Sequence, residues 1–271
     1  MSKLIVTANS ISHLNTLLKK DIDGVILYIK DLSVNSSFYI TEKELNKIDF
    51  LNKEVFICIN KIMHNNDLIL IDNFLYAIKE KNYKILFYDM AVYNIAKKYN
   101  IIDKLVLYQD HLNANSISNN FYYDLGIKGS YINSDITKEE LTLLKKNSKG
   151  FIMYTTFGYV PIFYSRRYLV TNYLKFIGKN KKDTNYYIKD ETDKYPIKEE
   201  DYGTTIYTKK PINLINHQKE LNNIDYLVLH SNLINDNEFN IMIDKYINKE
   251  RIDNEYIGFY NTKTIFKVKG E

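Results

Sequence analysis

The stretch Ile102–Glu140, IDKLVLYQDHLNANSISNNFYYDLGIKGSYINSDITKEE, decides the fold of this chain because it contains the same structural unit twice. The first unit is a short apolar strand, Lys104–Tyr108, followed by a polar turn and a helix over Ser116–Leu125. The second begins with the strand Lys128–Ile132 and again leads through polar residues into a helix. This repeat is typical of a parallel α/β fold, in which chemistry sits at the carboxyl ends of the strands.

The helices of this stretch have recognisable boundaries. Gly126 follows the first helix, at a position where a C-cap favours a residue that adopts positive φ. Thr137 and Glu140 have the spacing of a capping box at the start of the second helix. The first helix also has one apolar stripe, formed by Ile117, Phe121 and Leu125.

The rest of the chain repeats this unit. Further strands are predicted over Leu4–Ala8, Gly24–Ile29, Glu54–Asn60, Lys84–Asp89, Gly150–Thr155 and Tyr226–His230. Further helices are predicted over Ser10–Lys20, from the Thr41–Glu44 capping box, over Asp67–Lys81, up to Tyr99, over Ile212–Leu221 and over Asn237–Ile247. Eight such units in 271 residues predict a closed (β/α)8 TIM-like barrel, with an open doubly wound sheet as the alternative. No Gly-x-Gly-x-x-Gly follows the first strand, so a dinucleotide-binding domain has no support.

Residues 158–208 interrupt the repeat and predict a small β-rich insertion after the seventh strand. Tyr186–Lys189 and Tyr195–Lys198 alternate like the two strands of a hairpin, and Gly203–Tyr207 predicts another strand. An insertion at this position would lie over the mouth of the barrel. The tail, Tyr256–Val268, alternates weakly and predicts a short hairpin.

Composition bounds the class of protein. The chain fits one domain over residues 1–271, and its net charge of +4 is too small for a dedicated nucleic-acid binder but allows a local basic groove. The single cysteine, Cys58, lies in an apolar run and predicts a buried side chain. The start, MSKLIVTANS, lacks a secretion signal, and no run approaches about 18 apolar residues. We expect a soluble cytoplasmic protein that does not contact a membrane.

The segment FGYVPIFYSRR, residues 157–167, resembles the signature of peptidase family U32, in which a Gly-x-Leu-Pro-type turn leads to a Tyr/His-Ser-x-Arg element. Residues 112–140 and 186–215 resemble the same family upstream and downstream. The likeness covers most of the chain, in order and at fitting spacing, and is strongest to the short members of low-GC bacteria. The family is similar to a TIM barrel in fold.

The resemblance implies more than one activity. Some family members are described as collagenase-like proteases, whereas the group that looks most similar is tied to prephenate-dependent 5-hydroxylation of the wobble uridine of tRNA. Relatives in quinone biosynthesis carry an iron–sulfur cluster on four cysteines, one directly after the Ser-x-Arg element. That position is Tyr168 here, and Cys58 is the only thiol, so no cluster is expected in this chain. We expect a role in tRNA hydroxylation, with prephenate as a possible substrate and a second, cluster-bearing or larger U32-family subunit as partner.

The candidate catalytic residues, Asp110 and His111, follow the fifth strand. Histidine titrates near neutral pH and acts as an acid or a base, and a neighbouring carboxylate can orient its ring. The alternative is a solvated loop in which Asp110 bonds backbone amides. Asn113 and Asn115 are candidates for substrate binding through their amides, or else cap the next helix. His230, at the end of the eighth strand, is a further binding candidate at the barrel mouth.

Arg166 and Arg167 follow the turn at Pro161 and stand beside Tyr164, which is also a candidate for ligand contact. Arg167 is the preferred candidate of the two, because it matches the arginine of the family element. Paired guanidinium groups suit carboxylates or phosphates, and tyrosine rings stack on bases. The segment therefore predicts a prephenate site, an RNA site or an ion pair that closes the insertion. A basic patch follows at Lys175 and Lys179–Lys182, beside Tyr173, Tyr186 and Tyr187, and suits either tRNA or an exposed loop.

Protease activity has no motif in this sequence. His-Glu-x-x-His and Gly-x-Ser-x-Gly are both missing, and Cys58 lies in the middle of a predicted strand. The five histidines show no metal-binding spacing, so no metal site is predicted. A collagenase-like peptidase, which rests on the family name, and a non-catalytic scaffold with a degenerate barrel mouth remain as alternatives.

Overall fold

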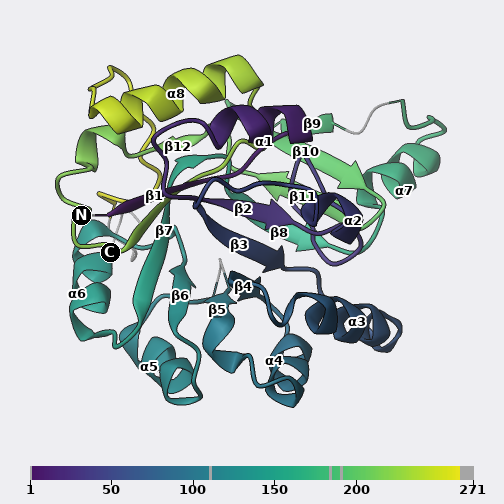
Figure 1. Cartoon of the computed structure of the whole chain (residues 1–271). Coiled ribbons are helices and arrows are strands. Elements are labelled where there is room, and N and C mark those ends of the chain that lie inside the picture. Colours follow the sequence, from purple (N-terminus) through teal and green to yellow (C-terminus); the bar gives the residue numbers. More distant parts are fainter. Residues whose placement is uncertain (1, 110–111, 183–184, 190–191, 263–271) are drawn as a thin grey trace, which may run out of the picture.

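Eight parallel strands form a closed barrel in the computed structural model of this chain, which describes residues 2–109, 112–182, 185–189 and 192–262 (Figure 1). The strands are β1 (Lys3–Val6), β2 (Gly24–Tyr28), β3 (Glu54–Ile59), β4 (Tyr83–Phe87), β5 (Leu105–Tyr108), β6 (Gly129–Ile132), β7 (Phe151–Gly158) and β13 (Tyr226–Leu229). Consecutive strands pair, β7 pairs with β13, and β13 pairs with β1 in the register Lys3↔Tyr226 to Val6↔Leu229. The predicted barrel is therefore confirmed, and the open sheet was the wrong alternative.

Helices surround the barrel (Figure 1). They are α1 (Ile11–Leu17), α2 (Glu42–Leu45), α3 (Leu68–Ile78), α4 (Met90–Lys98), α5 (Ser116–Asp124), α6 (Lys138–Asn147) and α8 (Asp236–Asn248). The capping boxes at Thr41 and Thr137 are both present. In each, the threonine side chain accepts a hydrogen bond from the backbone N–H of the paired glutamate, whose side chain accepts one from the threonine N–H. Gly126 has φ +100°, as its position after α5 predicts.

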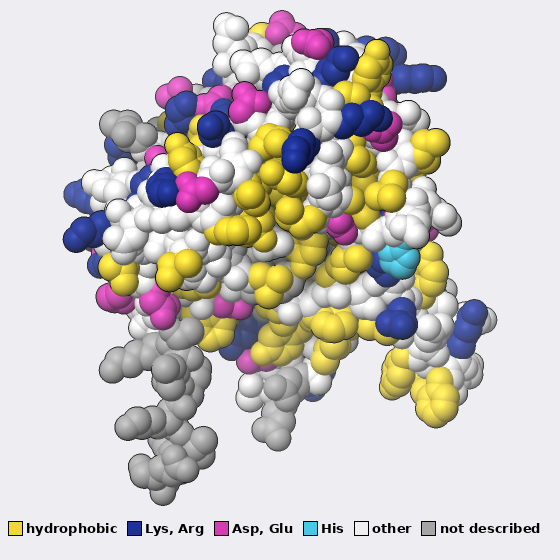
Figure 2. All heavy atoms as spheres, turned by 90° about the horizontal axis from the view of Figure 1, so that it is seen from below, with side chains coloured by type: hydrophobic (Ala, Val, Ile, Leu, Met, Phe, Trp, Pro, Cys, Tyr) yellow, Lys and Arg dark blue, Asp and Glu magenta, His cyan; other side chains and the backbone are white. Residues whose placement is uncertain are grey.

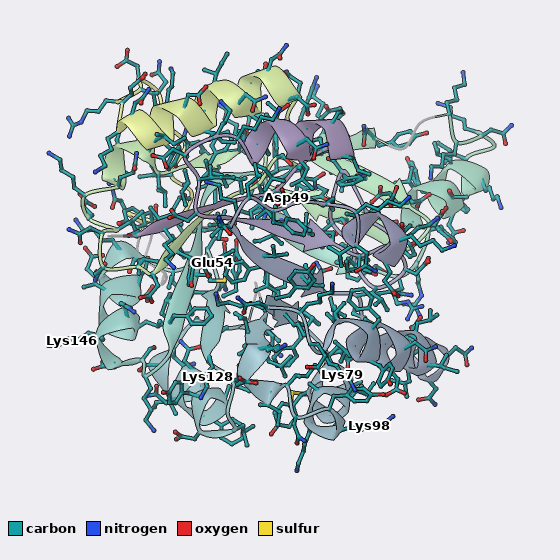
Figure 3. All side chains as sticks on the ribbon, in the orientation of Figure 1. Asp49, Glu54, Lys79, Lys98, Lys128 and Lys146 are labelled. Carbon is teal, nitrogen blue, oxygen red and sulfur yellow. The ribbon has the colours of Figure 1, made fainter. Side chains whose placement is uncertain are left out.

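Side chains fill the barrel interior. Alternate strand residues point inward and pack together, among them Ile26, Phe56, Leu86, Val106, Met153 and Val228. Cys58 lies in this cluster with no exposed surface, so its predicted burial is confirmed. At the amino-terminal end, the Glu54 carboxylate binds Lys3, Lys84 and, at 3.0 Å, the Tyr226 hydroxyl, and Figure 3 shows it near the centre of the barrel. The opposite end is therefore the end at which a ligand can enter.

The insertion after β7 is a second, antiparallel sheet with one helix. It contains β8 (Pro161–Ser165), α7 (Leu169–Phe176), β9 (Asn185–Lys189), β10 (Lys194–Glu200) and β11 (Gly203–Tyr207), in the strand order β8-β11-β10-β9. The predicted hairpin is confirmed, with Tyr195 paired to Ile188 and Lys198 paired to Asn185. Strand β8 and helix α7 were not predicted, because tyrosines and arginines mask the apolar pattern of this segment.

The predicted helix over Ile212–Leu221 is wrong. The segment instead contains the short strand β12 (Ile212–Asn213), which pairs antiparallel with the end of β7, and the 3-10 turn η3 (Ile215–His217). The helical spacing of its apolar residues arises because Ile212 and Leu214 are buried in one cluster with residues of β7 and of the chain after α8, whereas Ile215 is buried in the main core. Of the tail hairpin predicted over Tyr256–Val268, the described part forms turns, and residues 263–268 lie outside the described residues.

The apolar stripe of α5 does not face the barrel. Ile117 is 81% exposed and Phe121 is 61% exposed, whereas the buried residue of this helix is Asn119. Asn119 donates to Ser148 Oγ at 3.3 Å, so α5 contacts the chain after α6 through a polar side chain. None of the described helices is long and apolar enough to cross a membrane.

Candidate functional site at the barrel mouth

A cavity opens at the carboxyl ends of the barrel strands, beneath the insertion. Its main part has a volume of about 290 Å³ and adjoins a small recess of about 20 Å³, with Asn35, Tyr108 and Pro161 lining both. The main part is otherwise lined by Asn60, Ile62, Tyr88, Ile162, Phe163 and Tyr164. Strand β8 of the insertion forms one wall of the cavity.

A larger depression of about 580 Å³ lies outside the barrel, between α1 and the residues around α2. It is open to solvent and is lined by Ile11, Leu18, Glu44, Lys47 and Asp49, among others. Because it does not include the carboxyl end of a strand, we place the candidate site at the mouth instead.

Three side chains meet at the floor of the recess: the buried Tyr131 from β6, the buried Thr155 from β7 and the partly buried His230, which directly follows β13. The Tyr131 hydroxyl is 2.8 Å from Thr155 Oγ1 and 2.7 Å from His230 Nε2. Burial lowers the pKa of His230 to about 4, so the imidazole is neutral at neutral pH. When Nδ1 carries the ring hydrogen, Nε2 accepts a hydrogen bond from the Tyr131 hydroxyl. Tyr108 packs edge-on against Tyr131, with the ring centroids 4.7 Å apart.

Amide side chains join the rim of the barrel to the insertion. Thr205 of β11 donates to Asn35 Oδ1 at 2.5 Å, and Asn232 donates to the Tyr207 hydroxyl at 2.9 Å. Asn60 binds both backbone groups of Val34, at 2.9 and 3.1 Å, and so fixes the loop that follows β2. The contacts of Asn35 and Asn232 therefore join the insertion to the loops that follow β2 and β13.

Two cations share one carboxylate beside the cavity. Lys61 Nζ lies 2.8 Å from Asp67 Oδ1, and Arg166 Nη1 lies 3.4 Å from Asp67 Oδ2 and 2.9 Å from the Ile62 carbonyl oxygen. The hydrogen bonds from Lys61 and the His64 amide lower the pKa of Asp67 despite its burial. The cluster has a net charge of +1 and lies next to Ile62 and Tyr164, both of which line the cavity.

The structure brings three of the predicted binding residues to this region. His230 and Tyr164 line the cavity, and Arg166 lies at its rim. The Tyr164 hydroxyl donates to the Tyr202 carbonyl at 2.9 Å, and burial raises the pKa of Tyr164 to about 12. Arg166 also makes the ion pair that closes the insertion, which was one of the alternatives for the paired arginines.

Three other predicted residues, Asn113, Asn115 and Arg167, are not among the residues that line the cavity. Asn115 is the N-cap of α5 and accepts from Ser118 N at 2.9 Å, which is the structural alternative for this residue. Asn113 is buried and donates to the Tyr131 carbonyl at 3.3 Å, so it ties the loop after β5 to β6. Arg167 is exposed on the insertion. The predicted catalytic pair, Asp110 and His111, lies outside the described residues.

Sequence reasoning missed Tyr131, Thr155 and Tyr108. A usable signal existed, because these residues occupy the last inward-facing positions of their strands, two residues after Gly129, Met153 and Val106, respectively. Polar side chains at such positions face the mouth, whereas the prediction considered only residues beyond the strand ends.

The residues present do not fit a four-thiolate cluster. Cys58 is enclosed in the barrel, and Tyr168, at the position of the relatives' cysteine, is exposed and donates to the Asp201 carbonyl at 2.9 Å. Among the described residues, no group of three or more His, Cys, Asp or Glu side chains is arranged to hold a metal ion.

The fold and this site define a (β/α)8 barrel protein with an antiparallel insertion over a cavity at the mouth. The chain belongs to peptidase family U32, whose sequence profile matches residues 9–249. It is also similar to tRNA hydroxylation protein P2 of Bacillus subtilis (strain 168), with 22% identity over 232 residues that cover 81% of this chain and 75% of the relative. No solved structure gives a significant match.

Proposed function

We propose that this protein takes part in the prephenate-dependent 5-hydroxylation of the wobble uridine of tRNA. The observation that carries the proposal is the similarity to a tRNA hydroxylation protein, which spans most of both chains. The family profile, over residues 9–249, includes β6, β7 and β13, whose side chains meet at the mouth. The mouth supplies hydroxyl, imidazole and amide groups around a cavity of about 290 Å³, a volume near the lower end of the range for small-molecule sites.

The rim cluster supports an anionic ligand. Prephenate is a dicarboxylate, and Lys61 and Arg166 supply two positive charges against the single carboxylate of Asp67. Tyr164 and Tyr108 line the cavity beside them, so a ring could pack on apolar surface while a carboxylate points to the rim. In this arrangement Arg166 both closes the insertion and attracts the ligand.

A second subunit would supply the redox chemistry. The only thiol of this chain is enclosed in the barrel, so a cluster, if the reaction needs one, has to come from another U32-family protein. Within this chain, the neutral imidazole of His230 and the Tyr131 hydroxyl would hold or move a proton at the floor of the recess.

The experiment is complementation of a strain that lacks the gene, followed by mass spectrometry of the nucleosides of its tRNA. We expect 5-hydroxyuridine to be lost in the deletion strain, restored by the wild type, and not restored by Tyr131→Phe or His230→Gln. Tyr76→Phe is the matched control, because Tyr76 is 58% exposed on α3, outside the barrel. Unchanged 5-hydroxyuridine in the deletion strain, with cleavage of gelatin by the pure protein, would favour the peptidase alternative.

Complementation also separates the enzyme from the scaffold. If Tyr131→Phe and His230→Gln both restore full modification, the mouth has no chemical role and the protein acts as a scaffold. A pull-down with the tagged wild type tests the expected partner, and the proposal requires a second U32-family subunit among the captured proteins.

A further inference from the structure

Positive charge is concentrated in one part of the insertion. Residues 166–189 contain seven cationic side chains and one acidic side chain, whereas the whole chain has a net charge of only +4, so the remainder is net negative. The cations are Arg166, Arg167, Lys175, Lys179, Lys181, Lys182 and Lys189. The segment is therefore a local basic region on a protein whose overall charge does not reveal it.

Most of these cations are not used within the fold. Arg166 pairs with Asp67, and Lys181 pairs with Glu199 at 3.1 Å. The other five are exposed, and their side chains have no hydrogen-bond or ion-pair partner in the described part of the chain. Exposed cations without partners contribute nothing to folding, but they are available to bind phosphates.

Aromatic side chains are exposed among these cations. Phe176 is 88% exposed and Tyr173 is 62% exposed on α7, and Tyr187 is 65% exposed on β9, the edge strand of the insertion sheet. Leu169, Tyr173 and Phe176 follow the spacing i, i+4, i+7, so they form one stripe along α7. Helix α7 lies at the right of Figure 1, and the lobe at the right of Figure 2 shows hydrophobic side chains next to Lys or Arg side chains.

The stripe is held outward by a buried anchor. The Glu199 carboxylate has no exposed surface and accepts from Val170 N at 2.7 Å and Thr171 N at 3.2 Å, the first turn of α7. Val170 is thereby buried against the sheet, and the opposite side of the helix faces solvent. Helix α7 is thus fixed in an orientation that presents its aromatic stripe to a partner.

We infer that α7 and the lysines around it form a binding surface for single-stranded RNA. Exposed rings flanked by unpaired cations are the combination that binds single strands, because bases stack on the rings while the cations bind the phosphates. An anionic membrane would be attracted by the same charges. However, the apolar stripe has only three residues on one eight-residue helix, which gives little area to bury in lipid. This inference builds on the proposed function, because it assigns the RNA of that reaction to a surface.

The test measures binding of the full-length chain to a fluorescein-labelled single-stranded RNA 15-mer by fluorescence anisotropy, at several salt concentrations. The first variant combines Lys175→Gln, Lys179→Gln and Lys182→Gln. The matched control combines Lys43→Gln, Lys81→Gln and Lys146→Gln, which are exposed on other elements and remove the same charge; Figure 3 shows Lys146 at the far side of the molecule, on α6. The second variant is Phe176→Ala.

We expect the lysine variant at α7 to bind at least about tenfold more weakly at low salt, and its salt-dependence slope to fall by about 2, because roughly 0.7 counterion is released per phosphate contact. The control variant keeps the wild-type affinity within about threefold, since only general attraction changes. Phe176→Ala weakens binding by about fivefold or more through lost stacking, with an unchanged salt slope. All variants change exposed side chains, so thermal melting should match the wild type.

Three outcomes would overturn the inference: no RNA binding by the wild type at low salt, equal losses in the two lysine variants, or binding to phosphatidylserine vesicles with none to RNA. These outcomes are separate from the fate of the proposed function, because binding is measured on the pure chain. If the wild type binds RNA through α7 but deletion of the gene leaves 5-hydroxyuridine unchanged, the inferred surface stands and the proposed reaction is refuted. If deletion of the gene abolishes 5-hydroxyuridine but the α7 variants bind RNA like the wild type, the proposed reaction stands and the inferred surface is refuted.

Discussion

Replacing Glu199 with glutamine should release α7 from the insertion sheet while the barrel stays folded. The carboxylate accepts hydrogen bonds from Val170 N, Thr171 N, the Thr171 hydroxyl and, at 3.0 Å, Thr204 Oγ1, and it pairs with Lys181. A glutamine has one acceptor oxygen, so in either orientation its NH2 group faces at least two of these donors. The negative charge at the amino terminus of α7 is lost as well.

The magnitude follows from these contacts. Each donor left without an acceptor costs about 1–3 kcal/mol, and removing one member of a buried ion pair costs about 3–5 kcal/mol when the other cannot escape. Lys181 is 28% exposed and can turn to solvent, so the lower end applies. We expect a loss of about 3 kcal/mol in the local stability of α7, which corresponds to roughly a 100-fold change in its opening equilibrium.

Hydrogen exchange followed by mass spectrometry measures this change directly, because local opening governs exchange of the amides. Peptides that contain α7 should exchange roughly 100-fold faster in Glu199→Gln, and peptides from the barrel strands should be unchanged. Asp201→Asn is the control, since it removes the same charge nearby from an exposed side chain. Equal protection of α7 in the wild type and Glu199→Gln would refute the anchoring role of this carboxylate.

The same carboxylate predicts a dependence on pH. Its hydrogen bonds to Thr171, Lys181 and Thr204 hold the pKa of Glu199 below the ordinary value despite burial. A group whose folded pKa is depressed contributes stability above its unfolded pKa and loses it as the pH falls through the folded pKa. Protection of α7, corrected for intrinsic exchange, should therefore be constant from pH 7 to about 5 and fall below about pH 4.5, and this step should be missing in Glu199→Gln.

Three other changes test the fold and the rim. Asp67→Asn leaves Lys61, which is 6% exposed, without its anion, so the free energy of unfolding measured in urea should fall by about 3 kcal/mol. Asp72→Asn, which breaks an exposed ion pair, is the control and should have a much smaller effect. Equal effects would show that the rim cluster is not buried in solution. Gly203→Ala should destabilise the insertion by more than about 2 kcal/mol, because Gly203 has φ +128° and a Cβ would lie 2.0 Å from a backbone oxygen of β8. Faster proteolysis within the insertion would show this loss of stability. The Cys58 thiol, which has no exposed surface, should react with a thiol reagent only in denaturant, and rapid labelling of the native protein would contradict the packed barrel.

The barrel could be predicted because each strand–helix unit is encoded locally. Apolar runs such as Leu105–Tyr108, and caps such as Thr137 and Asn115, depend on a few neighbouring residues, and both caps are present. The helix predicted over Ile212–Leu221 was wrong because its apolar residues are buried without forming a helix. Ile212 lies in a short strand that pairs with β7, and Leu214 is buried just after it. Periodicity records that a residue is buried, but not which partner buries it.

The candidate site was only partly accessible from sequence. His230 and Tyr164 could be selected because a strand end and a signature segment mark them, and both line the cavity. Strand alternation could have placed Tyr131 and Thr155 on the inward face, but their contact with each other is visible only in the closed barrel. Their proximity to His230 depends on side chains from β6, β7 and the end of β13 reaching the same end of the barrel.

The sequence by itself determined the repeating unit, the position of the insertion and the single thiol, which cannot form an internal four-cysteine cluster. It favoured a closed barrel, but the pairing of β13 with β1 in the tertiary structure decided the closure. Only the tertiary structure decided which polar groups meet at the mouth, that Arg166 is bound to Asp67 while Arg167 is exposed, and that α7 presents its aromatic stripe outward. The physical reason is range: helix caps and strand patterns act over a few residues, whereas a site is assembled from side chains that lie about a hundred residues apart, such as Tyr131 and His230.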